Sequence, residues 1–182
     1  MRLSPLGFIF AGLALLSGCS DPVPPTPRGA WTVSFVDTGI DCQHGGHNAK
    51  VGDVGPSTKN AVVVDGTEGA NVNCTVKASG KGFSVDASLQ QSDKYLTLLV
   101  NEISASANET APAKGGVGYS SANTVDTYTT TETDKCDYYF VPSAQGVAAG
   151  RIWVSFKCPA LYAEGSTCAI TQGYAIFENC DE

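Results

Sequence analysis

Several features that would indicate a particular chemistry are missing from this sequence. Histidine occurs only twice, and no Cys-x-x-Cys pair, glycine-rich phosphate loop or EF-hand pattern is found. Without Cys-x-x-Cys, a thioredoxin-like redox site or a zinc ribbon has no basis. We therefore expect no cofactor, and we predict that the protein is not an enzyme.

Positive charge is also scarce. The chain has 11 basic and 18 acidic residues, which gives a formal net charge of −7. Nucleic acids and anionic lipid surfaces both select a concentrated positive patch. We expect no nucleic-acid partner, and the scattered acidic residues are typical of a solubility feature.

No apolar run is long enough to cross a membrane. Leu6–Leu16 supplies eleven mostly apolar residues after Arg2, whereas a spanning helix needs roughly 17 to 25. The run ends in Leu16-Ser17-Gly18-Cys19, which resembles the lipobox of bacterial lipoproteins. The resemblance implies a signal peptide over residues 1–18 and fatty acylation of Cys19 as the new N-terminus. An ordinary secretory signal, with Cys19 left as a thiol, is the alternative.

The resemblance also implies a location. Two or more acyl chains anchor a protein stably, so the partner implied first is a membrane, reached through the lipid. In the sorting pattern of bacterial lipoproteins, Asp directly after the cysteine favours inner-membrane retention. Ser20 takes that place here, which favours the outer membrane of the cell envelope. Residues 19–29 carry four prolines within six positions and are predicted to form an extended stalk.

The cysteine count fits this interpretation. Seven cysteines become six once Cys19 carries lipid, and export to an oxidising compartment predicts three disulfides. The candidates are Cys42, Cys74, Cys136, Cys158, Cys168 and Cys180.

Two hairpin geometries near the C-terminus suggest different pairs. A hairpin centred on Val147 places Cys136 opposite Cys158, whereas a following hairpin places Cys158 opposite Cys168. We favour Cys158–Cys168, because the Pro159–Thr167 loop needs a restraint, although the sequence does not fix the connectivity.

Strand patterns dominate residues 30–182, which are expected to form one ectodomain. Trp31–Val36 and Phe83–Leu89 alternate in polarity, and no long helical stripe is found. Ser104–Gly118 is interpreted as a long exposed loop. The prediction is an all-β, disulfide-stabilised β-sandwich of Ig-like or jelly-roll type with about nine strands. The other expected strands are Ala61–Val64, Val72–Val76, Tyr95–Val100, Thr124–Thr131, Tyr138–Val141, Arg151–Phe156 and Ala169–Phe177.

The strand Arg151–Phe156 offers a candidate ligand-binding face. Ile152, Val154 and Phe156 share the face expected to point inward. Arg151 and Trp153 share the other face, where a large aromatic among hydrophilic neighbours is typical of a sugar-stacking platform. We predict a non-catalytic binding or structural ectodomain for adhesion, surface recognition or envelope assembly, contacting envelope protein or glycan.

Two alternatives are kept open. A metal-binding envelope protein would use His44 and His47, with Cys42 or a nearby Asp as a further ligand. A secreted-type hydrolase would place two carboxylates in a groove of the sandwich. A serine nucleophile is less favoured, because Gly118-Tyr-Ser-Ser-Ala122 only partly matches Gly-x-Ser-x-Gly and no histidine follows it.

Overall fold

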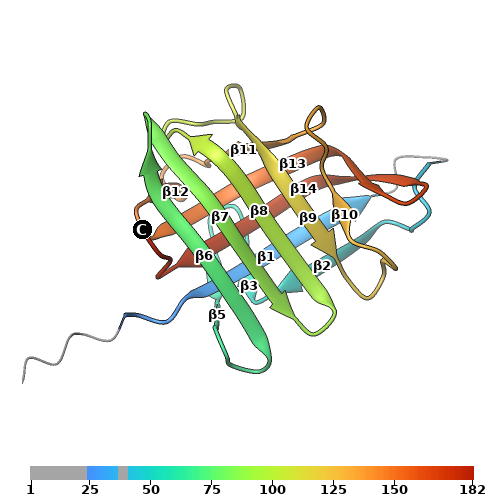
Figure 1. Ribbon diagram of the computed structural model, residues 1–182, viewed down its shortest axis with the longest axis horizontal. Coiled ribbons are helices and arrows are strands. Elements are labelled where there is room, and N and C mark those ends of the chain that lie inside the picture. The colour runs from blue at the N-terminus through green and yellow to red at the C-terminus, as the bar shows by residue number, and fades with distance from the viewer. Residues whose placement is uncertain (1–23, 37–40) are drawn as a thin grey trace, which may run out of the picture.

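Antiparallel strands make up most of the computed structural model, which describes residues 24–36 and 41–182 (Figure 1). The predicted signal peptide, Cys19 and the first part of the predicted stalk lie outside these residues. Within the described ranges, no helix has the length and apolar character that crossing a membrane requires.

Fourteen strands are found in the described part of the chain. They are β1 (Arg28–Val36), β2 (His47–Val51), β3 (Asp53–Val54), β4 (Lys59–Ala61), β5 (Val63–Val64), β6 (Ala70–Ser79), β7 (Gly82–Gln91), β8 (Lys94–Ile103), β9 (Ala113–Ser120), β10 (Tyr128–Thr129), β11 (Cys136–Tyr139), β12 (Gly146–Ala148), β13 (Arg151–Ala163) and β14 (Ser166–Glu178).

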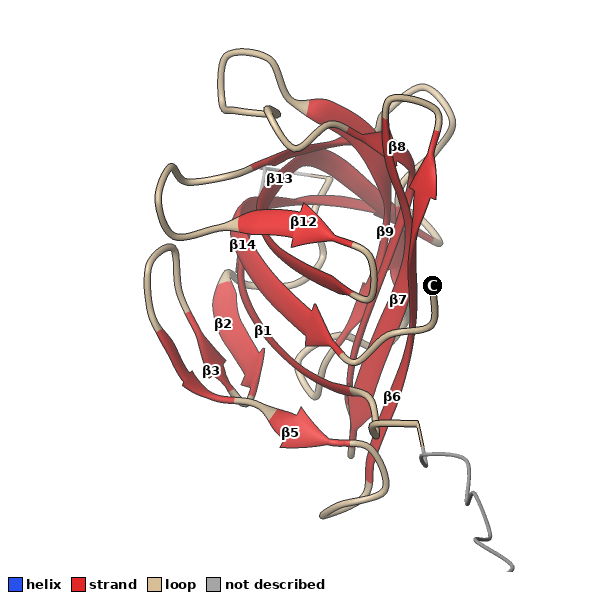
Figure 2. Ribbon diagram, turned by 90° about the vertical axis from the view of Figure 1, so that its left-hand side faces the viewer, coloured by secondary structure: helices blue, strands red, loops and turns tan. Residues whose placement is uncertain are grey.

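Twelve of these strands form one antiparallel sheet that folds over on itself. Its order is β2-β1-β14-β13-β10-β9-β8-β7-β6, with β5 on β1 and with β11 and β12 on β13. Strands β6 to β9 cross in front of β1, β13 and β14 in Figure 1, and Figure 2 shows the two layers from the side. The predicted all-β sandwich is confirmed, with more strands than the nine expected because several are only two or three residues long.

The core lies between the two layers. Alternate residues of a strand point to the same face, and Trp31, Val33 and Phe35 of β1 are at most 1% exposed. The Trp31 indole reaches across the core, where its Nε1 donates a hydrogen bond to the Leu89 carbonyl of β7 at 3.3 Å. On β13, the predicted inward face is confirmed, because Ile152, Val154 and Phe156 are also at most 1% exposed (their relative exposures are 1%, 0% and 0%).

The end of the predicted stalk is held against the domain. Strand β1 begins at Arg28, within the range predicted as stalk, and pairs with Glu178 of β14. The carbonyl of Pro27 accepts a hydrogen bond from the backbone N–H of Asp65 at 2.9 Å. The end of the range predicted as stalk therefore belongs to the folded domain.

Strand β6 lies at the end of the sheet path and is paired by a segment that follows β14. The backbone N–H of Asp181 donates to the Cys74 carbonyl at 2.9 Å, and the N–H of Val76 donates to the Asp181 carbonyl at 2.8 Å. The N–H of Gly150 donates to the Val76 carbonyl at 2.9 Å. Backbone groups in the middle of β6 are therefore satisfied on both sides.

Three disulfides connect the six candidate cysteines. Cys42 pairs with Cys168, Cys74 with Cys180, and Cys136 with Cys158. The Cys42–Cys168 bridge connects the segment that precedes β2 with strand β14. The Cys74–Cys180 bridge connects β6 with the segment that follows β14. The third links β11 to β13. The prediction of three bridges is confirmed for these residues.

The favoured Cys158–Cys168 pair was wrong. The β13–β14 hairpin turns at Glu164 and Gly165, so that Leu161 rather than Cys158 lies opposite Cys168. Gly165 takes a positive φ of 68°, which suits this tight turn. The alternative hairpin is confirmed, because β11 pairs with β13 in the register that places Cys136 opposite Cys158.

Two further expectations need correction. The predicted loop Ser104–Gly118 ends before Ala113, where strand β9 begins. Of the predicted strand Thr124–Thr131, only Tyr128–Thr129 is paired. The glycines of β9 lie in the range that was interpreted as a loop, but Gly115 is needed in the strand. A Cβ at this position would lie 2.8 Å from the Tyr138 ring and 2.7 Å from the Leu99 carbonyl oxygen.

Candidate binding groove

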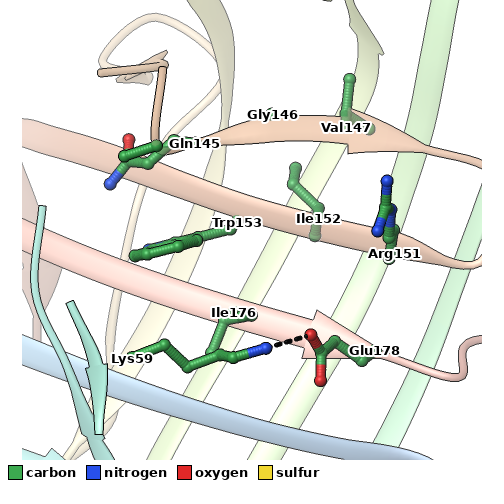
Figure 3. A pocket seen from close by; sticks show the side chains of 10 residues that line it. Lys59, Gln145, Gly146, Val147, Arg151, Ile152, Trp153, Ile176 and Glu178 are labelled. Carbon is green, nitrogen blue, oxygen red and sulfur yellow. Dashed lines mark hydrogen bonds and ion pairs between the residues drawn. The ribbon is translucent and has the colours of Figure 1, made fainter. Parts of the chain in front are cut away.

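A groove of about 290 Å³ lies on the outer face of the layer formed by β13 and β14. Strand β12 and the preceding residues flank one side, and β4, which carries Lys59, flanks the other (Figure 3). The lining residues are Lys59, Ala144, Gln145, Gly146, Val147, Arg151, Ile152, Trp153, Ile176 and Glu178.

Trp153 forms the aromatic wall of this groove. It is half-buried, and its Nε1 donates a hydrogen bond to the Gly55 carbonyl at 3.2 Å, which fixes the orientation of the ring. Its cross-strand neighbours are Ile176 on β14 and Gly146 on β12. Cross-strand neighbours point to the same face of a sheet. Because Gly146 has no side chain and a Cβ built there meets no heavy atom within 4 Å, the groove stays open beside the indole.

Gln145 supplies a polar side chain that is held at its amide oxygen. Its Oε1 accepts hydrogen bonds from the Val141 backbone N–H at 3.0 Å and from the Ser155 hydroxyl at 2.9 Å. A backbone N–H only donates, so the atom facing it is the oxygen, and the amide nitrogen points the other way. That Nε2 is buried without a hydrogen-bond partner among the described residues, on the side of the Trp153 ring in Figure 3. Leaving a buried donor unpaired costs about 1–3 kcal/mol.

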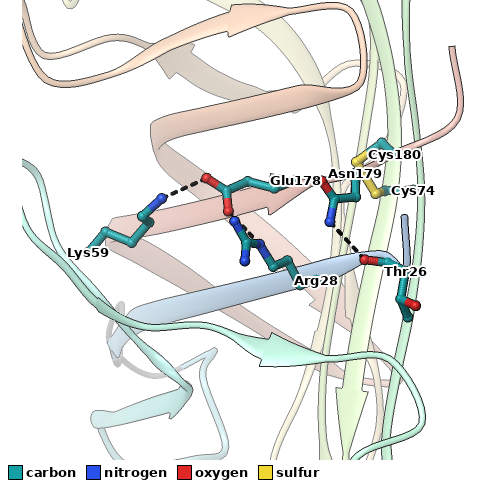
Figure 4. A network of polar contacts seen from close by, with 7 residues as sticks. All are labelled: Thr26, Arg28, Lys59, Cys74, Glu178, Asn179 and Cys180. Atoms are coloured by element: carbon teal, nitrogen blue, oxygen red, sulfur yellow. Dashed lines mark hydrogen bonds and ion pairs between the residues drawn. A yellow bond between two sulfur atoms is a disulfide. The ribbon is translucent and has the colours of Figure 1, made fainter. Parts of the chain in front are cut away.

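Glu178 is the carboxylate at the floor of the groove. It accepts a hydrogen bond from Arg28 Nε at 2.8 Å and from Lys59 Nζ at 2.7 Å (Figure 4). Burial favours the neutral acid, but the hydrogen bonds and positive charges of Lys59 and Arg28 outweigh it and lower the pKa of Glu178. The carboxylate is therefore ionised and already neutralised by protein cations.

Arg151 lies at the end of the groove, next to Glu178 in the β13–β14 ladder. It is exposed, and no ion pair joins it to a carboxylate among residues 24–36 and 41–182. The guanidinium carries five donors and no acceptor. Its donors are available to a molecule that enters the groove.

The structure thus brings together the two residues singled out from the sequence, Arg151 and Trp153. Their role in ligand binding stays a prediction. Sequence reasoning did not single out Gln145 or Gly146. It also missed Lys59, which comes from a short strand far away in the sequence and is placed by tertiary contacts alone.

The histidines do not converge on a metal site in the described part of the chain, where no group of three potential ligands is found. Cys42 is in a disulfide, and His44 packs edge-on against Tyr128 at 5.7 Å between ring centroids. Both ring nitrogens of His47 have protein partners, the Gly45 carbonyl at 3.0 Å and the Tyr119 hydroxyl at 2.8 Å. Of the two aspartates near these histidines in the sequence, Asp41 is exposed and Asp37 lies outside the described residues.

A serine lies close to a histidine in an unexpected place. Ser121 Oγ is 3.0 Å from His47 Nε2, although the two residues are 74 positions apart. Ser121 is only 5% exposed, which leaves little room for a substrate. Its hydroxyl also accepts a hydrogen bond from the Asn123 backbone N–H at 3.3 Å. This cluster therefore has the character of a structural contact between the start of β2 and the end of β9.

Comparisons with models of known families, with curated proteins and with solved structures find no match to this chain.

Proposed function

We propose that the protein is a lipid-anchored lipoprotein of the cell envelope whose β-sandwich is a non-catalytic binding module. The groove beside Trp153 is its contact site. The anchoring part depends on the lipobox and on Cys19. The three disulfides support an oxidising compartment outside the cytoplasm, because such bonds are rare where thiols are kept reduced.

The observation that carries the binding function is a groove in which the Trp153 indole lies near the exposed guanidinium of Arg151 and the buried amide nitrogen of Gln145, both unpaired among the described residues. Ligand sites typically combine an apolar or aromatic wall with a few convergent polar groups. Catalysis by paired carboxylates is not favoured in this groove. Among its described lining residues, Glu178 is the one carboxylate, and it is engaged with two cations.

The partner is a component of the envelope, a glycan or a protein, reached from the membrane by the proline-rich stalk. A test is to measure retention of the detergent-solubilised, full-length protein on immobilised envelope polysaccharide and on immobilised outer-membrane proteins. We expect retention on one of the two matrices, reduced at least tenfold by Gly146→Leu. This substitution fills the groove from β12 and removes none of its donors, because a Cβ at Gly146 meets open space.

A matched control is Val125→Ser, which changes an 88% exposed side chain that does not line the groove. Circular dichroism and thiol titration establish that each variant is folded. Retention that is equal in Gly146→Leu and in the wild type, or absent on both matrices, contradicts the proposed function.

A further inference from the structure

We propose that the groove binds a saccharide ring that carries a carboxylate. The ring packs on Trp153, the carboxylate pairs with Arg151, and a further oxygen accepts a hydrogen bond from Gln145. This inference rests on the proposed function and names the chemical class of its ligand.

The aromatic wall of the groove offers an apolar surface and no free donor. Trp153 Nε1 is already satisfied by the Gly55 carbonyl, so the indole has no donor left to offer. What it offers is its apolar surface, left uncovered on the β12 side because Gly146 has no side chain. A flat molecule with C–H groups on one face and oxygens around its rim fits such a wall, and a pyranose ring has that character.

The charge of the groove differs in sign from that of the whole chain. The whole chain is acidic, with a net charge of −7, yet the charged residues that line this groove are two cations and one carboxylate. Glu178 is shared between Lys59 and Arg28, whereas no ion pair joins Arg151 to a carboxylate in the described residues. Arginine matches a carboxylate with two parallel hydrogen bonds, which is the geometry that it favours. The cation without a protein partner therefore selects an anionic group on the ligand.

Among the described residues, the hydrogen-bonding groups left unpaired in the groove are donors. Gln145 Oε1 and the Glu178 carboxylate are both engaged by protein donors. The amide nitrogen of Gln145 and the guanidinium of Arg151 are donors without a partner among the described residues. A ligand with several acceptor oxygens satisfies both groups, once the Gln145 side chain shifts slightly to bring its buried nitrogen to the ligand. A purely apolar ligand satisfies neither.

The spacing agrees with one sugar residue. Arg151 and Trp153 are alternate residues on one face of β13, and such residues lie roughly 7 Å apart. This separation is of the order of one pyranose ring together with its carboxylate. An acidic peptide would also pair with Arg151, but it has no ring of oxygens to place beside an indole, so it serves as the competing outcome of the test.

The test uses the folded, full-length protein in detergent and a matched pair of probes, methyl β-D-glucuronide and methyl β-D-glucoside. The two differ only in the carboxylate. Saturation-transfer NMR and tryptophan fluorescence report binding, and because Trp31 is fully buried, a change in fluorescence reports mainly on Trp153. We expect the glucuronide to bind about tenfold more tightly than the glucoside.

Three variants locate the interaction. Arg151→Gln should abolish the preference for the glucuronide and leave the weak binding of the glucoside. Gln145→Glu, which is nearly isosteric and replaces the donor by an acceptor, should weaken both probes. Gly146→Leu should remove binding of both, and Val125→Ser should change neither.

The saccharide assignment is overturned if neither probe binds, if both bind equally, if Arg151→Gln keeps the preference, or if an acidic tripeptide displaces the glucuronide at lower concentration. These failures are distinguishable from failure of the proposed function. If Gly146→Leu reduces retention on envelope material while the glucuronide does not bind, the groove is a binding site for another ligand class.

Discussion

The aromatic ring of Phe156 lies directly over Gly173, its cross-strand neighbour in the β13–β14 hairpin. A Cβ built at Gly173 would overlap the ring, and Phe156 itself is fully buried. The ring also stacks on Tyr138, with 5.7 Å between ring centroids. Because Gly173 has no side chain, the Phe156 ring can fill this part of the core.

A methyl group at this position should therefore destabilise the protein. Gly173→Ala forces Phe156 from its place, and we expect a loss of about 1–3 kcal/mol in the free energy of unfolding, as overpacked cores show. Urea denaturation followed by circular dichroism measures it. Gly146→Ala is the matched control, because its Cβ enters open space and should leave stability unchanged or slightly higher. Equal effects of the two substitutions would show that the packing at Gly173 is looser than described.

The disulfides should contribute unequally to stability. The Cys42–Cys168 bridge joins residues 126 positions apart, whereas Cys136–Cys158 joins residues 22 apart. If the bridges stabilise by reducing the entropy of the unfolded chain, replacing both cysteines of the longer loop by serine should lower the free energy of unfolding by about 5 kcal/mol. The same change in the shorter loop should lower it by about 3.5 kcal/mol. Denaturation of the two double variants compares them. In the unfolded, unreduced wild type, thiol titration should detect no free thiol among these six cysteines.

The contribution of Glu178 should depend on pH. Because Lys59 and Arg28 lower its pKa in the folded protein below the usual 4.5, the ionised carboxylate stabilises the fold at neutral pH. That stabilisation is present above the unfolded-state pKa and is lost as pH falls through the folded-state pKa. Glu178→Gln should therefore be less stable than the wild type at pH 7, with the difference shrinking toward pH 3. Urea unfolding at both values checks this. A difference that is constant with pH would assign the effect to packing.

Lipid anchoring is tested at Cys19. If this residue carries the acyl chains, Cys19→Ala should move the protein from the membrane pellet to the soluble fraction or leave the precursor uncleaved. Metabolic labelling with radioactive palmitate should mark the wild type alone. Ser20→Asp is a useful companion, because it should redirect the lipoprotein toward the inner membrane without preventing acylation. Unchanged partitioning of Cys19→Ala would refute the lipoprotein assignment.

Structural features that depend on neighbouring residues in the sequence were predicted, whereas those that depend on distant segments were not. The alternation in Arg151–Phe156 predicted both the buried face and the outer face with Arg151 and Trp153, because a strand allows only two side-chain directions. The register that places Cys136 opposite Cys158 was also predicted, because it depends on a single hairpin. By contrast, the partner of Cys168 is Cys42, which comes from the other end of the domain and is brought close only by the folded sheet.

The parts that were missed have physical causes. Strand β9 contains Gly115, Gly116 and Gly118, a composition typical of loops, and it is a strand because neighbouring side chains such as Tyr138 occupy the space above it. The groove was missed in part because the proposed role of Gln145 depends on its amide nitrogen having no hydrogen-bond partner. No sequence pattern reveals whether a buried donor has a partner, since that depends on how Val141 and Ser155 are positioned.

The segment that covers the middle of β6 has a consequence for self-association. An unprotected outer strand offers its main chain to a neighbouring molecule, including a second copy of the same chain. Here Asp181 and Gly150 occupy the hydrogen-bonding positions that a second copy would need, and the Cys74–Cys180 bridge fastens the covering segment in place. Reducing that bridge should thus expose the middle of β6 and promote polymerisation by strand addition.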